Sequence, residues 1–254
     1  MGLTGAFAVN CGLRRLRFSR ICSIERFSGG WPRRVGGAWR ALPAGFPPSR
    51  TVYVWFRRRI EKGLFESLMR ALARRQRRRC SRRATPCLAI IDARNVRCLG
   101  VRGPRGYDGA MKLVGRKRVA LVGAEGHVLA LAVVPANVQD RDTLTALDNG
   151  KAAWPNLRLA LLDGAFTAER CHLHGMRHRV VEKNPDQKGF VVLERRRLVE
   201  RTFGWLSHWG CLLHERAGRL DVATGRLACV AASWPSLPST IQPKTATQTG
   251  SECA

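Results

Sequence analysis

Acidic side chains are scarce in this chain of 254 residues, which has 18 Asp and Glu against 45 Lys and Arg and a formal net charge of +27. Only Glu25, Glu61 and Glu66 precede Asp92, which is the first aspartate in the chain. So large a positive excess goes beyond what solubility requires and predicts a polyanionic partner. Nucleic acid is favoured over an anionic membrane surface.

Other absences exclude further classes. No apolar run approaches the roughly 20 residues that span a bilayer, so no membrane partner is expected. The nine cysteines contain no Cys-x-x-Cys pair, which argues against a zinc ribbon. Their odd number and scattered positions favour reduced thiols, and hence a cytoplasmic, nucleoid-associated protein.

Changes in composition divide the chain into four segments. Residues 1–36 are rich in Arg and Gly and are expected to be poorly ordered. Residues 37–83 show helical spacing of apolar side chains on both sides of Gly63, which predicts either a helix-turn-helix or an ordinary helical hairpin with a basic outer face. Residues 84–232 alternate apolar runs with helical patterns and predict an α/β domain. Residues 233–254 are rich in Pro, Ser and Thr and predict a disordered tail.

Short apolar runs predict strands near 87–92, 118–123, 127–134, 157–162 and 178–182. We expect one mixed sheet in which the first three strands are antiparallel and the first and fourth are neighbours.

Helical patterns between the strands predict two helices. One follows Asp140 and is stopped by Pro155, and the other covers about 167–174.

Two of the predicted strands end in a carboxylate. Asp92 follows the run Cys87–Ile91, and Asp163 follows Leu157–Leu162. Open α/β sheets bind ligands at the carboxyl ends of their strands, so both aspartates are candidates for a site. The alternative for Asp92 is that it caps a turn.

A third carboxylate, Glu200, lies on a predicted helix. Leu198, Thr202 and Trp205 share one face of that helix, and Glu200 lies off it. A solvated glutamate beside helix-spaced arginines is the alternative. If the helix crosses the sheet edge, two Asp and one Glu suit two Mg²⁺ ions about 3.5–4 Å apart, with Mn²⁺ as a possible substitute.

The glycine-rich segment Gly103–Gly109 predicts a loop or hairpin tip, and cations follow it closely. Glycine lets backbone approach a ligand and the cations would neutralise phosphates, although a solvated basic turn is the alternative. The candidate DNA-binding residues of the chain are Arg105, Lys112, Arg116, Lys117, Arg118, Arg196, Arg197 and Arg201.

These residues carry a resemblance to the DDE transposases of bacterial insertion sequences, and most closely to the insertion-sequence-five family. Asp92, Asp163 and Glu200 are separated by 71 and then 37 positions, which suits that family. The more specific matches are Gly103–Gly109, Pro135–Asp142, and Lys188–Leu193 leading into the segment around Glu200. The resemblance extends from about Gly37 to Ala232.

The resemblance implies a ribonuclease-H-like mixed sheet flanked by helices, preceded by a small basic helical segment. It implies Mg²⁺-dependent cleavage and strand transfer of DNA ends, with Asp92, Asp163 and Glu200 as catalytic and metal-binding residues. The implied partners are the terminal inverted repeats of the element, target DNA and further copies of the same chain.

Several positions depart from the family pattern. Leu193 stands at the tyrosine position of Tyr-x-x-Arg-x-x-x-Glu, Gly123 stands where Asp is common, and Ser207-His208 stand where a Lys or Arg is usual. The two termini also differ, which leaves an inactive DNA-binding remnant as one alternative. A host nuclease with the same core is another, and strand transfer into a target would distinguish it from a transposase.

Overall fold

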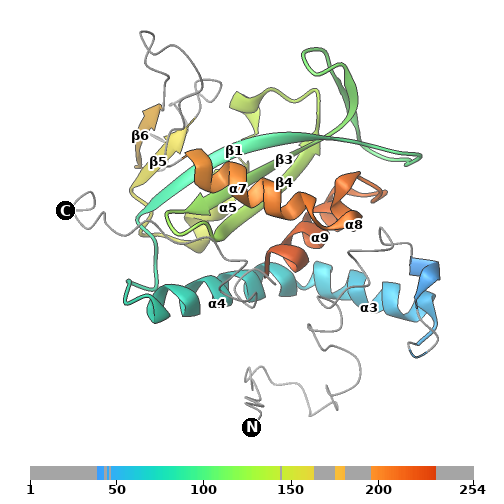
Figure 1. Cartoon of the computed structure of the whole chain (residues 1–254), viewed down its shortest axis with the longest axis horizontal. Coiled ribbons are helices and arrows are strands. Elements are labelled where there is room, and N and C mark those ends of the chain that lie inside the picture. Colours follow the sequence, from blue (N-terminus) through green and yellow to red (C-terminus); the bar gives the residue numbers. More distant parts are fainter. Residues whose placement is uncertain are drawn as a thin grey trace.

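The computed structural model describes residues 39–42, 45, 47–143, 145–162, 175–180 and 196–232. The predicted helix at 167–174, Asp163, the 1–36 segment and the 233–254 tail lie outside these residues. The elements in chain order are η1 (Trp39–Ala41), α3 (Ser49–Glu61), α4 (Leu64–Arg79), β1 (Leu88–Arg97), β2 (Gly106–Asp108), β3 (Leu113–Gly123), β4 (Val128–Pro135), η2 (Asp140–Asp142), α5 (Thr145–Ala153), β5 (Leu159–Leu162), β6 (Arg177–Val180), α7 (Arg196–Ser207), α8 (Gly210–Leu213) and α9 (Leu220–Ala232) (Figure 1).

The strands in the described residues form one six-stranded sheet with the order β2-β3-β1-β5-β6, and β4 pairs with β3. The pairs β1–β3, β3–β4 and β2–β3 are antiparallel, whereas β1–β5 and β5–β6 are parallel. The predicted contact between the first and fourth apolar runs is confirmed, because Leu88 pairs with Leu159 and Ile90 with Leu161. The expected mixed α/β sheet flanked by helices, consistent with a ribonuclease-H-like fold, is thereby confirmed.

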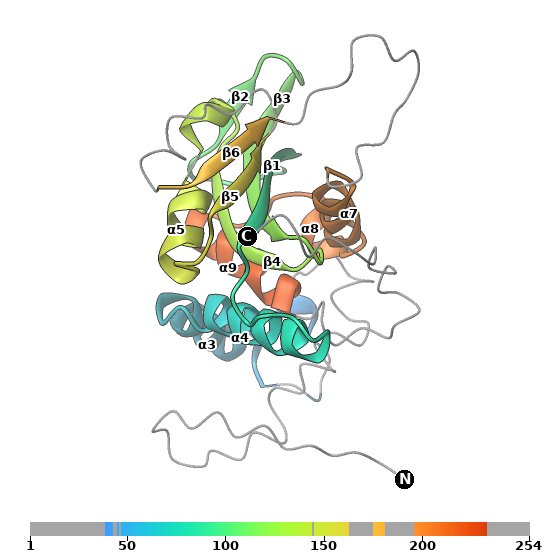
Figure 2. The same ribbon diagram turned by 90° about the vertical axis from the view of Figure 1, so that its left-hand side faces the viewer.

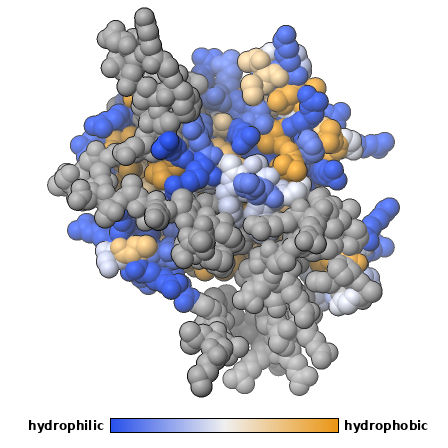
Figure 3. Space-filling model, viewed as in Figure 1, coloured by the Kyte–Doolittle hydropathy of each residue, from blue (hydrophilic) through white to orange (hydrophobic). Residues whose placement is uncertain are grey.

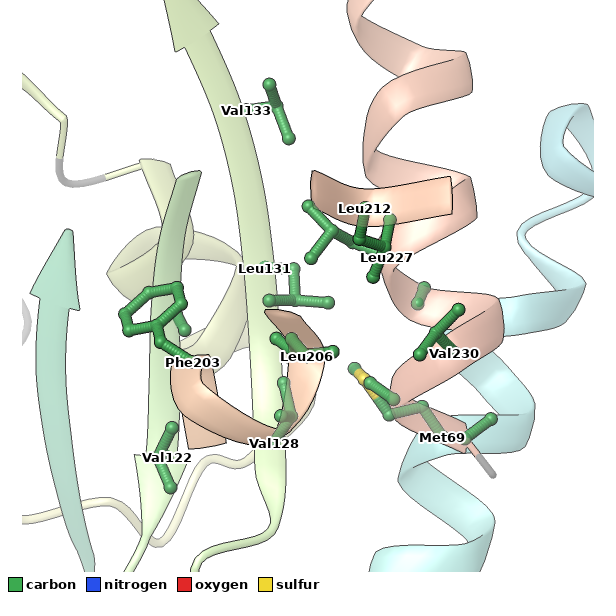
Figure 4. Packing of buried hydrophobic residues seen from close by; sticks show 14 of the residues in the cluster. Met69, Val122, Val128, Leu131, Val133, Phe203, Leu206, Leu212, Leu227 and Val230 are labelled. Atoms are coloured by element: carbon green, nitrogen blue, oxygen red, sulfur yellow. The ribbon is translucent and has the colours of Figure 1, made fainter. Parts of the chain in front are cut away.

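The sheet is covered on both faces by helices, and each face has its own hydrophobic cluster. In Figure 2, α5 lies on one side of the strands, and α7 lies on the other. Side chains alternate between faces along a strand. Accordingly, Ile90 and Ala120 belong to the cluster with α7 and α9, whereas Ile91 and Leu121 belong to the cluster with α5. Figure 4 shows the first cluster, in which Phe203 and Leu206 of α7 lie over β3 and β4.

Strand β1 is longer than predicted. It continues past Asp92 to Arg97 because β3 pairs with it along the whole length, from Ala89 opposite Gly123 to Arg97 opposite Gly115. Asp92 therefore lies within the strand and not at its carboxyl end, which corrects the sequence-based expectation. It also removes the alternative in which Asp92 caps a turn.

Helices α3 and α4 run end to end beneath the sheet in Figure 1, with Gly63 between them in the left-handed conformation (φ +60°). Phe56, Ile60 and Met69 are buried in the cluster around α7 and α9, whereas Ala73 of α4 belongs to the cluster with α5, and Met69 is seen in Figure 4. Helix α9 comes especially close to α3, since a Cβ on Gly225 would lie 2.5 Å from Ile60 Cγ1. That α3 and α4 form a separate DNA-binding segment stays a prediction.

The predicted helix after Asp140 is divided into η2 and α5, and it ends at Ala153, before Pro155. Glycine at position 150 lets this helix approach the sheet closely, because a Cβ there would lie 2.2 Å from Leu121 Cδ2. Within the described parts of the chain, no helix is both long and apolar enough to cross a membrane. Cys80, Cys98, Cys211 and Cys229 are free thiols, whereas Cys87 is disulfide-bonded, so the expectation of reduced thiols throughout is not met.

Candidate active site

Asp92 is half-buried in the middle of β1, on the face of the sheet that carries α7. Its neighbour two residues earlier, Ile90, packs in the cluster that includes Val199 and Phe203 of α7. Because side chains at i and i+2 share a face, Asp92 belongs to that face too. One carboxylate oxygen, Oδ1, accepts a hydrogen bond from the backbone N–H of Ala93 at 2.8 Å. The carboxylate is thus held by its own strand beneath the flank of α7.

Helix α7 packs against β1 and β3 and carries Glu200. Val199 and Phe203 are buried on either side of it in sequence, while Glu200 itself is exposed. At 100° per residue Glu200 lies about 60° around the helix from Phe203, so it lies on the flank of the buried face. The sequence placed Leu198 in this face, but Val199 is the fully buried residue and Leu198 only packs at the edge.

Asp163, the remaining predicted ligand, lies outside the described residues. It follows Leu162 directly in the sequence, and Leu162 ends β5 immediately after Leu161, the partner of Ile90. Within the part of the chain that the structure describes, no group of three His, Cys, Asp or Glu side chains could hold a metal ion. Of the three predicted ligands the structure therefore describes Asp92 and Glu200, which lie on two elements that pack together.

The turn between β3 and β4 holds α7 in place. The Thr202 hydroxyl lies 3.2 Å from the carbonyl oxygen of Gly126 and 2.8 Å from that of Leu198. Glu125, in the same turn, is buried and accepts hydrogen bonds from Arg77 of α4 and, at 3.0 Å, from Arg82. The turn therefore connects α4 with the helix that carries Glu200.

Sequence reasoning missed this role of Glu125, because a Gly-Ala-Glu-Gly turn gives no sign that its carboxylate will be buried. The run of arginines that contains Arg77 and Arg82 is typical of a basic, solvent-exposed segment. Arg77 is instead only 7% exposed.

Three of the predicted DNA-binding cations have partners inside the protein. Arg116 donates to the carbonyl oxygens of Pro104 (2.8 Å) and Ala217 (2.6 Å). Lys117, on the opposite face, donates to Val138 O (2.7 Å) and to Asp140 Oδ1 (2.5 Å).

Arg118 donates to Leu212 O at 2.7 Å and to Glu215 Oε2 at 3.2 Å. Burial lowers the pKa of Arg118, and the nearby Glu215 carboxylate opposes that shift. Arg116, Lys117 and Arg118 are each at most 7% exposed. Buried charges that are already paired cannot also neutralise phosphates, so we revise the sequence-based expectation and leave these three residues out of the DNA contact surface.

The other predicted cations differ in exposure. Arg105, Lys112 and Arg197 are exposed, and Arg105 also donates to the carbonyl oxygen of Val101. Arg201 is half-buried beside the β3–β4 turn, with its Nη2 atom 3.2 Å from where a Cβ of Gly126 would lie, and burial lowers its pKa. For Arg196 the structure describes the backbone, at the start of α7, but not the side chain.

Comparison with known proteins gives one family. Residues 83–234 match the family model described as the transposase DDE domain, which covers more than half of the chain. The match covers β1, β5 and α7, and so includes all three predicted carboxylates. It favours neither an inactive remnant nor a host nuclease. No curated protein matches the chain.

Proposed function

Because this chain belongs to the transposase DDE domain family, we propose that it cleaves the DNA ends of an insertion sequence of the insertion-sequence-five family and joins them to target DNA. The observation that carries the proposal is the packing of α7, which bears Glu200, against β1, which bears Asp92 on that same face. The parallel pairing of β5 with β1 supports a place for Asp163 beside them. Consecutive Cα atoms are about 3.8 Å apart, so Asp163 is tied closely to Leu162.

Asp92, Asp163 and Glu200 would hold the metal ions. The three carboxylates supply oxygen ligands, which the hard cation Mg²⁺ prefers, and Mn²⁺ would also fit. Two such ions would supply charge stabilisation to the attacking and leaving oxygens of a phosphodiester. The protein's own contribution is positional: the Ala93 amide holds Asp92, and the buried face of α7 with Thr202 holds the flank on which Glu200 lies.

Exposed cations would bind the DNA backbone. On the sheet side these are Arg105, Lys112 and Arg197, and on the outer side of α3 and α4 they include Arg58, Arg78 and Arg79. In Figure 3 hydrophilic residues cover much of the visible surface that is not drawn in grey. Each neutralised phosphate releases a counterion, so affinity should fall steeply with salt. We also propose that copies of this chain assemble on DNA in the cytoplasm.

The test is cleavage of DNA that carries the sequences flanking the coding region. Asp92→Asn, Asp163→Asn and Glu200→Gln each keep the shape of the side chain and remove a charge that binds metal. We expect each to abolish Mg²⁺-dependent cleavage and to leave DNA binding unchanged or tighter, because repulsion of phosphate falls. Asp148→Asn, on α5 across the sheet, serves as the matched control.

The outcomes separate the candidate functions. A Glu200→Gln variant that cuts normally would remove Glu200 from the site and leave Glu194 or Glu182 as alternatives. A parent chain that binds DNA but never cleaves it would support the inactive remnant. Cleavage without strand transfer would support a nuclease.

A further inference from the structure

A pocket lies at the end of the sheet formed by β2, β3 and the last residues of β1. It has a volume of about 420 Å³ and is lined by Cys98, Gly100, Val101, Arg102, Arg105 and Val114. The lining combines apolar side chains with two exposed guanidinium groups. Pockets of about 300–1,000 Å³ hold small organic ligands, so the volume suits one nucleotide.

An exposed aromatic ring stands beside this pocket. Tyr107 of β2 is 58% exposed and is the cross-strand partner of Val114, which lines the pocket. Directly paired residues on an antiparallel ladder share a face, so the ring and the pocket are neighbours. Met111 and Leu99 nearby are exposed as well. Figure 3 shows hydrophobic residues among hydrophilic ones at this end of the molecule, at the upper right.

Hydrogen bonds and close packing hold the residues on either side of Tyr107. Asp108 Oδ1 accepts hydrogen bonds from the backbone N–H groups of Ala110 (2.8 Å) and Met111 (3.0 Å), and Asn95 of β1 donates to the other carboxylate oxygen. Gly106 packs tightly against Asn137, since a Cβ there would lie 1.9 Å from Asn137 Oδ1. A site held in this way loses little conformational entropy when it binds.

This site is separate from the carboxylates but lies on the same face of the sheet. Val114 and Ala120 are both on the α7 face of β3, and Ala120 is the partner of Asp92. Six residues at about 3.3 Å each place Val114 about 20 Å along the strand from Asp92. One DNA strand could therefore contact both places.

We propose that the pocket binds one unpaired nucleotide of the DNA, with its base in the pocket and against Tyr107 and its phosphate on Arg102 and Arg105. The inference rests on the proposed function, because it takes DNA as the substrate. Bases stack on exposed aromatic rings without regard to sequence, and arginine adds contact with phosphate. Burial raises the pKa of the Cys98 thiol, so the apolar part of the pocket stays uncharged near neutral pH.

The first experiment measures binding of the full chain to two labelled probes by fluorescence anisotropy. One probe is a short duplex, and the other is the same duplex with a single unpaired thymidine. Stacking of one base corresponds to an affinity about tenfold higher for the second probe. Tyr107→Ala should remove this preference and leave duplex affinity nearly unchanged, whereas Tyr107→Phe should keep it. Arg102→Ala combined with Arg105→Ala should also remove the preference, and it should weaken binding of both probes because Arg105 is one of the cations proposed to contact the DNA backbone.

Arg58→Ala is the matched control, because Arg58 is an exposed cation of α3 and should weaken both probes equally. A preference that persists in Tyr107→Ala would overturn the inference, as would a parent chain with no preference. Failure to bind either probe would instead overturn the proposed function. If Tyr107→Ala alters the sedimentation of the chain and not the preference, the ring is a contact between proteins and the inference is wrong.

The second experiment needs no substitution. Alkylation of each cysteine is followed by mass spectrometry, with Cys80, exposed after α4, as the internal reference. The probe with the unpaired thymidine should slow alkylation of Cys98 severalfold relative to Cys80, and the plain duplex should not. Free thymidine monophosphate at the same concentration should give no protection, since the backbone contacts elsewhere supply most of the affinity. Equal protection by both duplexes would refute a site for an unpaired nucleotide.

Discussion

Replacing Arg118 by alanine distinguishes a cation that binds DNA from one that stabilises the fold. The substitution removes the hydrogen bonds to Leu212 O (2.7 Å) and to Glu215 Oε2 (3.2 Å). Glu215 is 2% exposed and would keep Arg116 Nη1 at 3.8 Å and the N–H groups of Arg216 and Ala217. The carboxylate would therefore remain buried with only part of its compensation.

Removing one partner of a buried ion pair costs about 3–5 kcal/mol of unfolding free energy. Because Glu215 retains other partners, we expect the lower end, about 3 kcal/mol. For a chain of this size 1 kcal/mol corresponds to roughly 2–4 °C, so Tm should fall by about 6–12 °C. Thermal unfolding followed by tryptophan fluorescence measures this fall in Tm. Trp205 and Trp209 are buried in the same hydrophobic cluster as Leu212, whose carbonyl oxygen accepts a hydrogen bond from Arg118.

Lys112→Ala is the control, because Lys112 is exposed and directly precedes β3, the strand that carries Arg118. It should leave Tm unchanged and reduce the slope of log affinity against log salt by about 0.9 if it contacts one phosphate. Arg118→Ala should leave that slope unchanged under conditions where the variant is folded. The reverse result, with a flatter slope and an unchanged Tm for Arg118→Ala, would refute the structural role.

Two further predictions concern stability. Burial lowers the pKa of His127 below the ordinary value for histidine, about 6.5, while Glu125 opposes the shift and Arg77 adds to it. The stability that neutral His127 contributes should therefore be present above about pH 6.5 and be lost as pH falls below it, and His127→Gln should flatten the dependence of unfolding free energy on pH in that range. Gly115→Ala should destabilise the chain by about 1–3 kcal/mol, because its Cβ would lie 2.2 Å from the carbonyl oxygen of Val96. Gly109→Ala, whose added Cβ would have nothing within 4 Å, should be nearly neutral, and urea titration of both variants measures the difference.

The sheet could be predicted from sequence because its strands are short apolar runs buried on both faces. The runs around Ile90 and Leu161 lack a polar side, which is typical of strands with helices on each face. The extension of β1 through Arg94 and Arg97 could not be predicted, since those residues are polar. They are strand because β3 offers a ladder of backbone partners as far as Gly115.

Whether the basic residues are buried or exposed could not be predicted from the residues next to them in sequence. Arg116, Lys117 and Arg118 directly precede the apolar run of β3, and their positions in sequence resemble those of a phosphate-binding loop. Their partners are distant along the chain: Arg116 and Ala217 are 101 positions apart, and Arg118 and Glu215 are 97 apart. Local patterns of charge therefore cannot distinguish a buried cation from a solvated one.

The placement of Glu200 depends on contacts that converge on the β3–β4 turn from both ends of the chain. Arg77 of α4 reaches Glu125, and Thr202 of α7 reaches the carbonyl oxygen of Gly126, the next residue. Gly126 has φ +81°, a conformation that glycine adopts without strain, so the turn presents both groups at once. Helix α4 and helix α7 are thus connected through two adjacent residues. It follows that a change in α4 that breaks its pair with Glu125 should displace or loosen α7 before it disturbs Asp92, which is held by β1 itself.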